Sequence, residues 1–270
     1  MEDQTTVRIC SAQITSIWED PERTLQKAEV FVRHASSSGA ALICFPEQFA
    51  TGWDPRPHKN IQDIHGSIVS SLQVFAKEYG IGILGSFRQK NDPLPRNTAV
   101  VIGKDGRILA SYAKMHLFSH GHEHEGNSPG TDLGIFKLGS MICGIAICYD
   151  LRFPDLFGLY AHKGVQAVFV PAAWPQIRIR HWELFIQARA LENQMYIVGV
   201  NTTGHTPVES YSGASITADP QGMIVSRANE AEQLLFCDLD PSVVDGARRS
   251  LPVAKDRKDQ VYEKLGKKSE

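Results

Sequence analysis

The chain has 270 residues and a formal net charge of −2; 42% of the residues are hydrophobic and 21% are charged, as in ordinary globular proteins. The near-neutral charge gives no electrostatic reason to expect nucleic acid or an anionic membrane as a partner. No apolar run reaches the ~20 residues that a membrane-spanning helix needs. The acidic, polar start MEDQTTVRIC does not have the pattern of a secretory signal.

The five cysteines are an odd number, none of them belongs to a Cys-x-x-Cys pair, and at least four lie in apolar, strand-like runs. This is not the pattern of a disulfide framework. We therefore expect free thiols and a reducing, cytoplasmic setting.

Strand-like apolar runs alternate with helical patterns through the first and middle thirds of the chain. The predicted strands outside hairpins are 7–14, 41–49, 81–87, 167–174, 195–201 and 233–240. The predicted helices are 21–39, 64–79, 154–163 and 180–194. Hairpins are predicted at 97–114, 132–148 and 211–228, with turns at Asp105, Gly139 and Pro220.

The sequence contains no interior linker, low-complexity stretch or fixed-period repeat. We therefore predict a single α/β domain over residues 1–270, with large mixed sheets between helical layers. Residues 253–270 form a charged tail, predicted as a helix with a frayed end that is too polar to add to the core.

Three ionisable residues directly follow apolar runs. Glu47 follows ALICFP, Lys114 follows RILASYA, and Cys148 follows MICGIAI. Ligands of α/β sheets bind beyond the carboxyl ends of strands, where loops present side chains on a rigid frame. A carboxylate, an ammonium group and a thiol at such ends predict a nucleophilic site.

The residue types suit this chemistry. A free thiol is mostly protonated at neutral pH, so it needs a base or a lowered pKa. Glu47 is the candidate base for Cys148, and the helix starting at Pro154 adds its positive end. Lys114 and the backbone N–H of Tyr149 are the candidate donors to the negative oxygen that forms when sulfur attacks a carbonyl or nitrile carbon.

Taken one at a time, these residues also have structural explanations. A cysteine in an apolar run is more often a small, inert hydrophobe than a nucleophile. Glu47 and Lys114 singly are typical of solvated loop charges or of ion-pair partners. Spacing alone leaves both interpretations open.

At these residues the sequence resembles the nitrilase superfamily, the carbon–nitrogen hydrolases. Three motifs occur in family order: FPEQFATGW with Glu47, SYAKMHLF with Lys114, and GIAICYDLRFPDLF with Cys148. A fourth stretch, HWELFIQARALENQMYIVGVN, is similar to the family's helix and strand beyond the site. The resemblance covers almost the whole chain. It implies a four-layer α-β-β-α sandwich with two mixed β-sheets, which pairs into an eight-layered homodimer.

The resemblance also implies a mechanism that requires no metal or organic cofactor. Glu47 activates Cys148, Lys114 supports the oxyanion, ammonia leaves, and Glu47 then activates the water that hydrolyses the thioester. Many family members carry a second glutamate after the lysine, which helps to position the substrate. In HLFSHGHEHEGNSPG, the offset from Pro129 favours Glu123 over Glu125.

The segment CYDLRFPDL is more similar to the small-amide branch, the omega-amidases and Nit-type proteins, than to true nitrilases or carbamoylases. The expected activity is hydrolysis of a small linear, non-peptide amide to a carboxylic acid and ammonia. An omega-amide of a dicarboxylic acid, such as 2-oxoglutaramate, is the example we favour. An N-carbamoyl amino acid hydrolase or a nitrilase with the same Cys-Glu-Lys site is the alternative.

A substrate carboxylate would require a cation in the pocket, and a bidentate arginine suits it best. Arg178 and Arg180 are the candidates. Arg152 is a weaker one, because Asp150 and Asp155 suggest structural pairing. The expected apolar walls are Tyr149, Trp174 and Phe118, with Trp53 and Asn201 as further candidates.

The loop after Lys114 supports a non-enzymatic alternative. Its possible ligands for zinc or another divalent ion are His116, His120, His122, His124, Glu123 and Glu125. Ligand spacing typical of a metal site is not evident, so we prefer a polar loop at the mouth of the site. A catalytically silent scaffold is a further alternative, against which the presence of all three strand-end residues argues.

Overall fold

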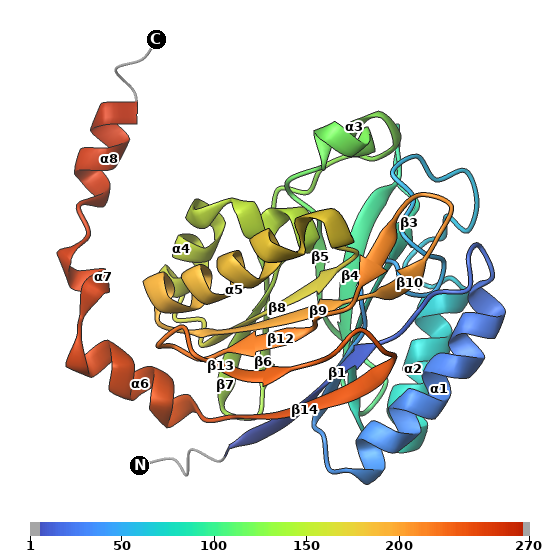
Figure 1. Ribbon diagram of the computed structural model, residues 1–270, viewed down its shortest axis with the longest axis horizontal. Coiled ribbons are helices and arrows are strands. Elements are labelled where there is room, and N and C mark those ends of the chain that lie inside the picture. Colours follow the sequence, from blue (N-terminus) through green and yellow to red (C-terminus); the bar gives the residue numbers. More distant parts are fainter. Residues whose placement is uncertain (1–5, 267–270) are drawn as a thin grey trace.

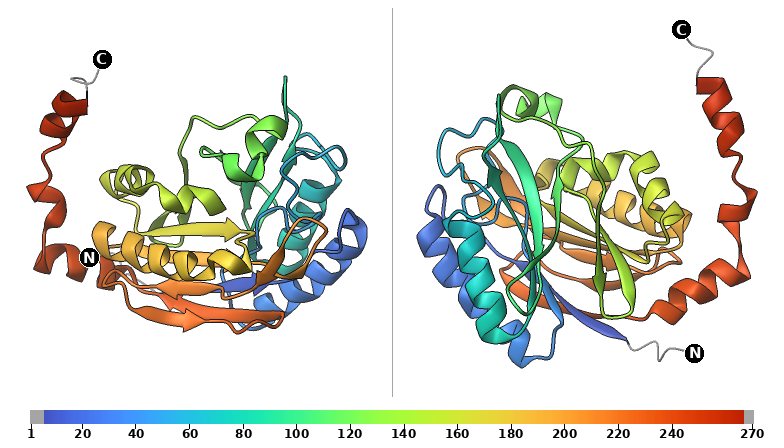
Figure 2. Two further views of the ribbon diagram at one scale, coloured as in Figure 1. Left: turned by 45° about the horizontal axis from the view of Figure 1, so that its top comes forward. Right: turned by 180° about the vertical axis from the view of Figure 1, so that it is seen from behind.

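The computed structural model describes residues 6–266, and within this range two six-stranded mixed sheets lie between two helical layers (Figure 1). Helices α1 (Pro21–Ser37) and α2 (Ser67–Tyr79) cover the outer face of one sheet. Helices α4 (Pro154–His162) and α5 (Ile179–Asn193) cover the outer face of the other, as the turned views of Figure 2 also show. This is the predicted four-layer α-β-β-α sandwich.

The first sheet has the strand order β14-β1-β2-β3-β4-β5. Its strands are β14 (Gln233–Leu239), β1 (Val7–Gln13), β2 (Leu42–Cys44), β3 (Gly82–Gln89), β4 (Arg96–Ile102) and β5 (Ile108–Ala113). Strands β1, β2 and β3 are parallel, whereas β14, β4 and β5 join through antiparallel pairs. The carboxyl ends of β2 and β5 therefore lie at the same edge of this sheet.

The second sheet has the order β13-β12-β9-β8-β7-β6. Its strands are β13 (Ile224–Arg227), β12 (Ile216–Ala218), β9 (Tyr196–Asn201), β8 (Ala167–Ala172), β7 (Met141–Ile145) and β6 (Gly134–Leu138). Strands β7, β8 and β9 are parallel. A separate antiparallel ribbon consists of β10 (Thr203–His205) and β11 (Ser210–Ser212).

Short helices lie in the loops and at the C-terminal end. They are η1 (Ser119–Gly121), α3 (Glu123–Gly126), η2 (Cys148–Arg152), η3 (Gln176–Arg178), α6 (Pro241–Ser250), α7 (Val253–Asp256) and α8 (Asp259–Gly266). The last three form an arm that leads away from the sandwich (Figure 1, orange-red to red). Among residues 6–266, no helix combines the length and hydropathy needed to cross a membrane.

The strands read as continuous apolar runs because both of their faces are buried. In β1, Ile9 belongs to the core between the sheets, and Cys10 belongs to the core beneath α1 and α2. Neighbouring residues of a strand point to opposite faces, so both must be apolar here. Each fully buried aliphatic side chain contributes about 1.5–3 kcal/mol relative to an exposed one, which makes the two sheets a rigid support for the loops at their edge.

Most predicted elements are present, with differences at several boundaries. The strand predicted over 41–49 is much shorter, because β2 ends at Cys44 and the chain turns after Pro46, which cannot donate a ladder hydrogen bond. The ribbon β10–β11 and helix α6 were not predicted. The charged tail is helical in α7 and α8, as expected, but residues 267–270 lie outside the described part of the chain.

Candidate active site

Loops at one edge of the sandwich bring the four predicted catalytic residues together. Glu47 lies in the turn after β2, Lys114 directly follows β5, Glu123 begins α3, and Cys148 begins η2 after β7. The Nζ of Lys114 lies 2.8 Å from Oε1 of Glu47 and 2.8 Å from Oε2 of Glu123. All four residues are buried. The two sheets thus contribute to one site.

Asn97 at the start of β4 is a site residue that the sequence analysis missed. Its Nδ2 lies 2.7 Å from Oε1 of Glu47 and 3.3 Å from Oε1 of Glu123. In the sequence, Asn97 is a single asparagine at the start of an apolar strand. An asparagine in that position is common for other reasons, so it did not indicate a site residue. Asn97 holds the two carboxylates in a fixed relation to each other.

Backbone N–H groups bind the Oε2 atoms of the same two carboxyl groups. The N–H of Ala173 donates to Oε2 of Glu47 at 3.0 Å, and the N–H of Phe118 donates to Oε2 of Glu123 at 2.7 Å. The indole N–H of Trp53 is 3.4 Å from Oε1 of Glu123. Several donors hold a buried carboxyl group in one orientation.

Cys148 occupies a sharp turn between β7 and η2. Its backbone has a φ of 45°, in the left-handed region that residues other than glycine rarely adopt. Such a conformation costs on the order of 1–3 kcal/mol and is found at functional sites. The Glu47 carboxylate lies close enough to the thiol to act on its pKa. The turn therefore places the Cys148 thiol beside the Glu47 carboxyl group.

Burial dominates the protonation of the site. It raises the pKa of the Cys148 thiol well above its ordinary value; the Glu47 carboxylate raises it further, and Lys114 opposes this. Burial likewise raises the pKa of Glu47, against the lowering effect of Lys114. Burial alone would lower the pKa of Lys114, but the carboxylates of Glu123 and Glu47 outweigh it and raise that pKa. The resting site therefore holds a neutral thiol beside a fixed ammonium group.

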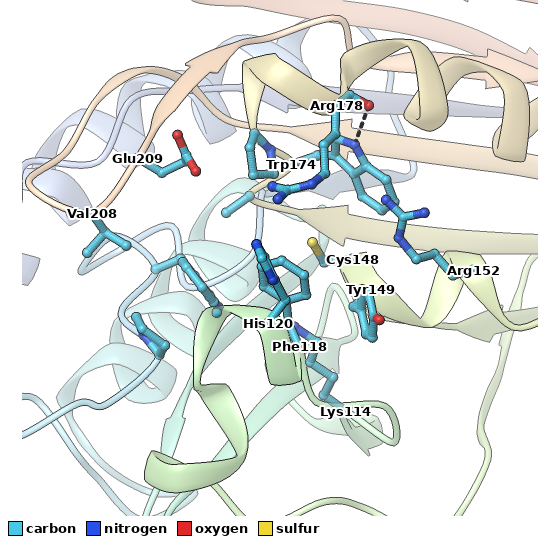
Figure 3. A pocket seen from close by; sticks show the side chains of 15 residues that line it. Lys114, Phe118, His120, Cys148, Tyr149, Arg152, Trp174, Arg178, Val208 and Glu209 are labelled. Carbon is cyan, nitrogen blue, oxygen red and sulfur yellow. Dashed lines mark hydrogen bonds between the residues drawn. The ribbon is translucent and has the colours of Figure 1, made fainter.

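A pocket of about 240 Å³ opens onto Cys148 (Figure 3). The predicted substrate-binding residues Tyr149, Trp174, Phe118 and Arg178 all line it. In Figure 3, Lys114 and Arg178 lie on opposite sides of the Cys148 sulfur. The pocket thus has a reactive end and a cationic end.

The sequence profile described as "Carbon-nitrogen hydrolase" matches residues 7–249. The chain belongs to the carbon–nitrogen hydrolase family. A 2-oxoglutaramate amidase of Bacillus subtilis (strain 168) is 32% identical over 244 residues, which cover 90% of this chain and 94% of that protein. Omega-amidase NIT2 of Danio rerio is 31% identical over 250 residues, covering 88% of this chain and 90% of that one.

A solved structure shows the same fold in this family. The crystal structure of Nit3 from Saccharomyces cerevisiae, a member of branch 10 of the nitrilase superfamily, matches with a TM-score of 0.84 at 28% identity. The match covers 92% of this chain and 95% of that one. The resemblance inferred from the motifs, the fold class and the assignment as a hydrolase of non-peptide carbon–nitrogen bonds are thereby confirmed.

Of the remaining candidates for substrate contact in this hydrolase, some line the pocket and others do not. Trp53 and Arg152 line the pocket, whereas Arg180 is exposed and does not. Asn201 lies behind the wall, where its side chain bonds the backbone N–H of Trp174 at 2.7 Å. Only one of the two arginines first considered therefore faces the pocket.

The expected pairing of Arg152 with neighbouring aspartates was wrong. Within residues 6–266, the structure gives Arg152 no ion pair with Asp150 or Asp155; its guanidinium lies 5.0 Å from the ring centroid of Trp174 and 5.2 Å from that of Phe185. Asp150 instead binds donors from other loops. Arg152 is thus held by aromatic faces at the edge of the pocket.

The pocket lining also includes His120, from the loop expected at the mouth of the site, and two residues that were not predicted, Val208 and Glu209. Val208 and Glu209 come from the turn of the ribbon β10–β11, which reaches the site from more than fifty residues beyond Cys148. A short ribbon with polar residues carries no sequence signal that places it at a pocket wall.

The histidine-rich loop does not gather its side chains around one point. Glu123 points inward to Lys114, His116 lies 2.8 Å from Asp150, and His122 pairs with the exposed Glu125 at 2.7 Å. Within the described residues, no group of three or more His, Cys, Asp or Glu side chains is arranged to hold a metal ion. Glu123 rather than Glu125 is the glutamate that contacts the lysine.

Proposed function

We propose that this carbon–nitrogen hydrolase is an amidase that converts a small linear amide to a carboxylic acid and ammonia through a thioester on Cys148. The observation that carries the proposal is the placement of Cys148, in the lining of a pocket of small-molecule size, beside the buried ion pair of Glu47 and Lys114. Because the pKa of the thiol is raised, the attack requires a base in contact with it. Glu47 meets that requirement.

In the acylation step, Sγ of Cys148 bonds to the amide carbon while Glu47 takes the thiol proton. The carbonyl oxygen becomes negative, and Lys114 donates to it together with the backbone N–H of Tyr149. Tyr149 lies in the first turn of η2, where N–H groups have no partner within the helix. One such donor typically contributes 10²–10³-fold to the rate, about 2.7–4 kcal/mol.

The tetrahedral intermediate then collapses, and the bond between carbon and nitrogen breaks. Glu47 returns its proton to the nitrogen, so that ammonia leaves and the acyl group stays on sulfur. In the second half, Glu47 takes a proton from water, hydroxide attacks the thioester carbon, and the Cys148 sulfur leaves and regains a proton. Glu123 keeps Lys114 charged and aimed at the oxyanion through both halves.

We further propose an omega-amide of a dicarboxylic acid, such as 2-oxoglutaramate, as the substrate. The relatives named above carry this activity in their names, and Arg178 places a cation across the pocket from Lys114. The Arg178 guanidinium lies 5.5 Å from the ring centroid of Phe118, which supports it from one side. It therefore keeps its donors for a substrate carboxylate.

The oligomeric state and location belong to the same proposal. We take residues 1–270 as one hydrolase domain that forms a homodimer in the cytoplasm. Exposed apolar side chains on the C-terminal arm, namely Leu251, Val261, Tyr262 and Leu265, and five free cysteines support this. Light scattering on purified protein tests the dimer; a monomer at micromolar concentration would contradict it.

The test of the function is ammonia release from short aliphatic amides, omega-amides of dicarboxylic acids, N-carbamoyl amino acids and nitriles. Cys148→Ala is measured beside the wild type. We expect fastest turnover for an omega-amide and none for Cys148→Ala. Faster turnover of carbamoyl compounds or nitriles would refute the amidase assignment, and wild-type activity in Cys148→Ala would refute the nucleophile.

A further inference from the structure

Asp150 is a buried carboxylate, two residues after Cys148, that does not line the pocket. Its Oδ2 accepts from the backbone N–H of Ile147 at 2.9 Å and from the hydroxyl of Tyr112 at 2.7 Å. Its Oδ1 accepts from the backbone N–H of His116 at 2.9 Å and lies 2.8 Å from Nδ1 of the same ring. The proposed mechanism assigns no task to this group.

The positions of its partners connect the two halves of the site. Ile147 directly precedes Cys148 on the second sheet. Tyr112 and His116 stand two residues before and two residues after Lys114, at the end of the first sheet. One carboxylate therefore fixes the backbone beside the nucleophile, the backbone of His116 after the lysine and the side chain of Tyr112 before it.

We propose that Asp150 is a positioning residue that sets the place of the Cys148 thiol relative to the Lys114 ammonium group. The inference rests on the proposed function, in which both groups act on one carbonyl. Cys148 and Lys114 belong to different sheets, so backbone hydrogen bonds within a sheet do not fix their separation. Asp150 supplies that link directly.

The arrangement requires a carboxylate, because each oxygen receives a backbone N–H. In Asp150→Asn, one of the two oxygens becomes an NH₂ group, which faces the N–H of either Ile147 or His116. A donor facing a donor in a buried site is strongly unfavourable, so one of the two loops moves. Burial and the Asp150 charge also raise the pKa of Tyr112 well above its usual value, so this phenol is a donor.

Three variants separate positioning from general stability. Asp150→Asn exchanges the acceptor, and Tyr112→Phe removes one donor while the carboxylate stays. Tyr160→Phe is the matched control, since Tyr160 is also a buried tyrosine, whose hydroxyl bonds the backbone of Ile145 and Gly134. Within residues 6–266, the Tyr160 hydroxyl forms no hydrogen bond with Asp150, Lys114 or residues 112–116.

For each variant, kcat, KM and the melting temperature are measured with the best amide of the panel. We expect Asp150→Asn to lower kcat by about 10²-fold, as a displacement near 1 Å does, with KM changed less than about twofold. Tyr112→Phe should lower kcat by roughly 3- to 10-fold, and Tyr160→Phe should keep the wild-type kcat. A wild-type kcat in Asp150→Asn would overturn the inference. It would also be overturned if kcat fell in all three variants in proportion to the fraction of protein that is folded.

A second measurement does not depend on turnover. Iodoacetamide labelling of Cys148, followed by mass spectrometry with Cys148→Ala as the blank, reports the contact of the thiol with its base. We expect slower labelling in folded Asp150→Asn and an unchanged rate in Tyr160→Phe; equal rates in wild type and Asp150→Asn would overturn the inference. If the wild type turns over no amide, the proposed function fails, and the labelling rates still decide the role of Asp150.

Discussion

The carboxylates of Glu47 and Glu123 share two donors, the Nζ of Lys114 and the Nδ2 of Asn97. Two buried carboxyl groups thus lie around one ammonium group. Removing charges from water is costly unless they are paired and hydrogen-bonded. Here the backbone N–H groups of Ala173 and Phe118 complete the pairing. Folding energy is thus used to hold a base and a cation side by side.

Lys114→Met should therefore reduce stability as well as activity. The substitution leaves two buried carboxylates without their counter-ion, and breaking such a pair typically costs about 3–5 kcal/mol. Chemical denaturation measures the loss. The double variant Lys114→Met with Glu123→Gln should regain part of the stability but no activity; equal stability of wild type and Lys114→Met would contradict the charge argument.

Glu123→Gln should lower kcat by about 10²-fold while KM changes little, since Glu123 lies behind Lys114 rather than in the pocket. An amide oxygen at the Oε2 position could still accept from both Lys114 and the N–H of Phe118, but the NH₂ group that replaces Oε1 would face other donors. These donors are the Nζ of Lys114, the Nδ2 of Asn97 and the indole N–H of Trp53, so the contact with Lys114 is disturbed. Steady-state kinetics tests this. Glu125→Gln, two residues away on the exposed side of α3, is the matched control and should keep full activity.

The pH dependence should follow Glu47. Burial raises its pKa, and the Glu123 charge raises it further. Only the carboxylate form accepts the thiol proton, so kcat/KM should fall as pH falls through this raised pKa. Glu123→Gln removes one of the raising charges and should move the acid limb to lower pH. An acid limb that shifts upward, or does not shift, would show that another group controls it.

The sequence specifies the layers, and the residues at the strand ends that meet at the site, for physical reasons. Strands buried on both faces are apolar throughout, so β2 and β8 stand out as continuous runs. Glu47, Lys114 and Cys148 are conspicuous because each interrupts such a pattern at a strand end. The match of three motifs in order then defines the family, which spacing alone left open.

The long-range contacts that complete the site could not be predicted from the sequence. Asn97 acts only because β4 places it between two carboxylates from other loops, and Glu209 reaches the pocket on a ribbon with no apolar pattern. The boundary of α6 had a local signal, because Asp240 caps it and Pro241 takes its first position. Long-range placement carries no such signature in one sequence.

Arg178 and Arg180 provide a direct test of the substrate proposal. Arg178 directly precedes α5 and lines the pocket, whereas Arg180 lies in the first turn of α5 and is exposed. Arg178→Met should raise KM for the omega-amide of a dicarboxylic acid by roughly 10- to 100-fold, as loss of charge-assisted hydrogen bonds does. A neutral aliphatic amide of similar length should be hydrolysed as before, because it has no carboxylate to lose. Arg180→Met should behave as wild type with both substrates. If Arg178→Met weakened both amides equally, its role would be to shape the pocket wall beside Phe118 rather than to bind a carboxylate.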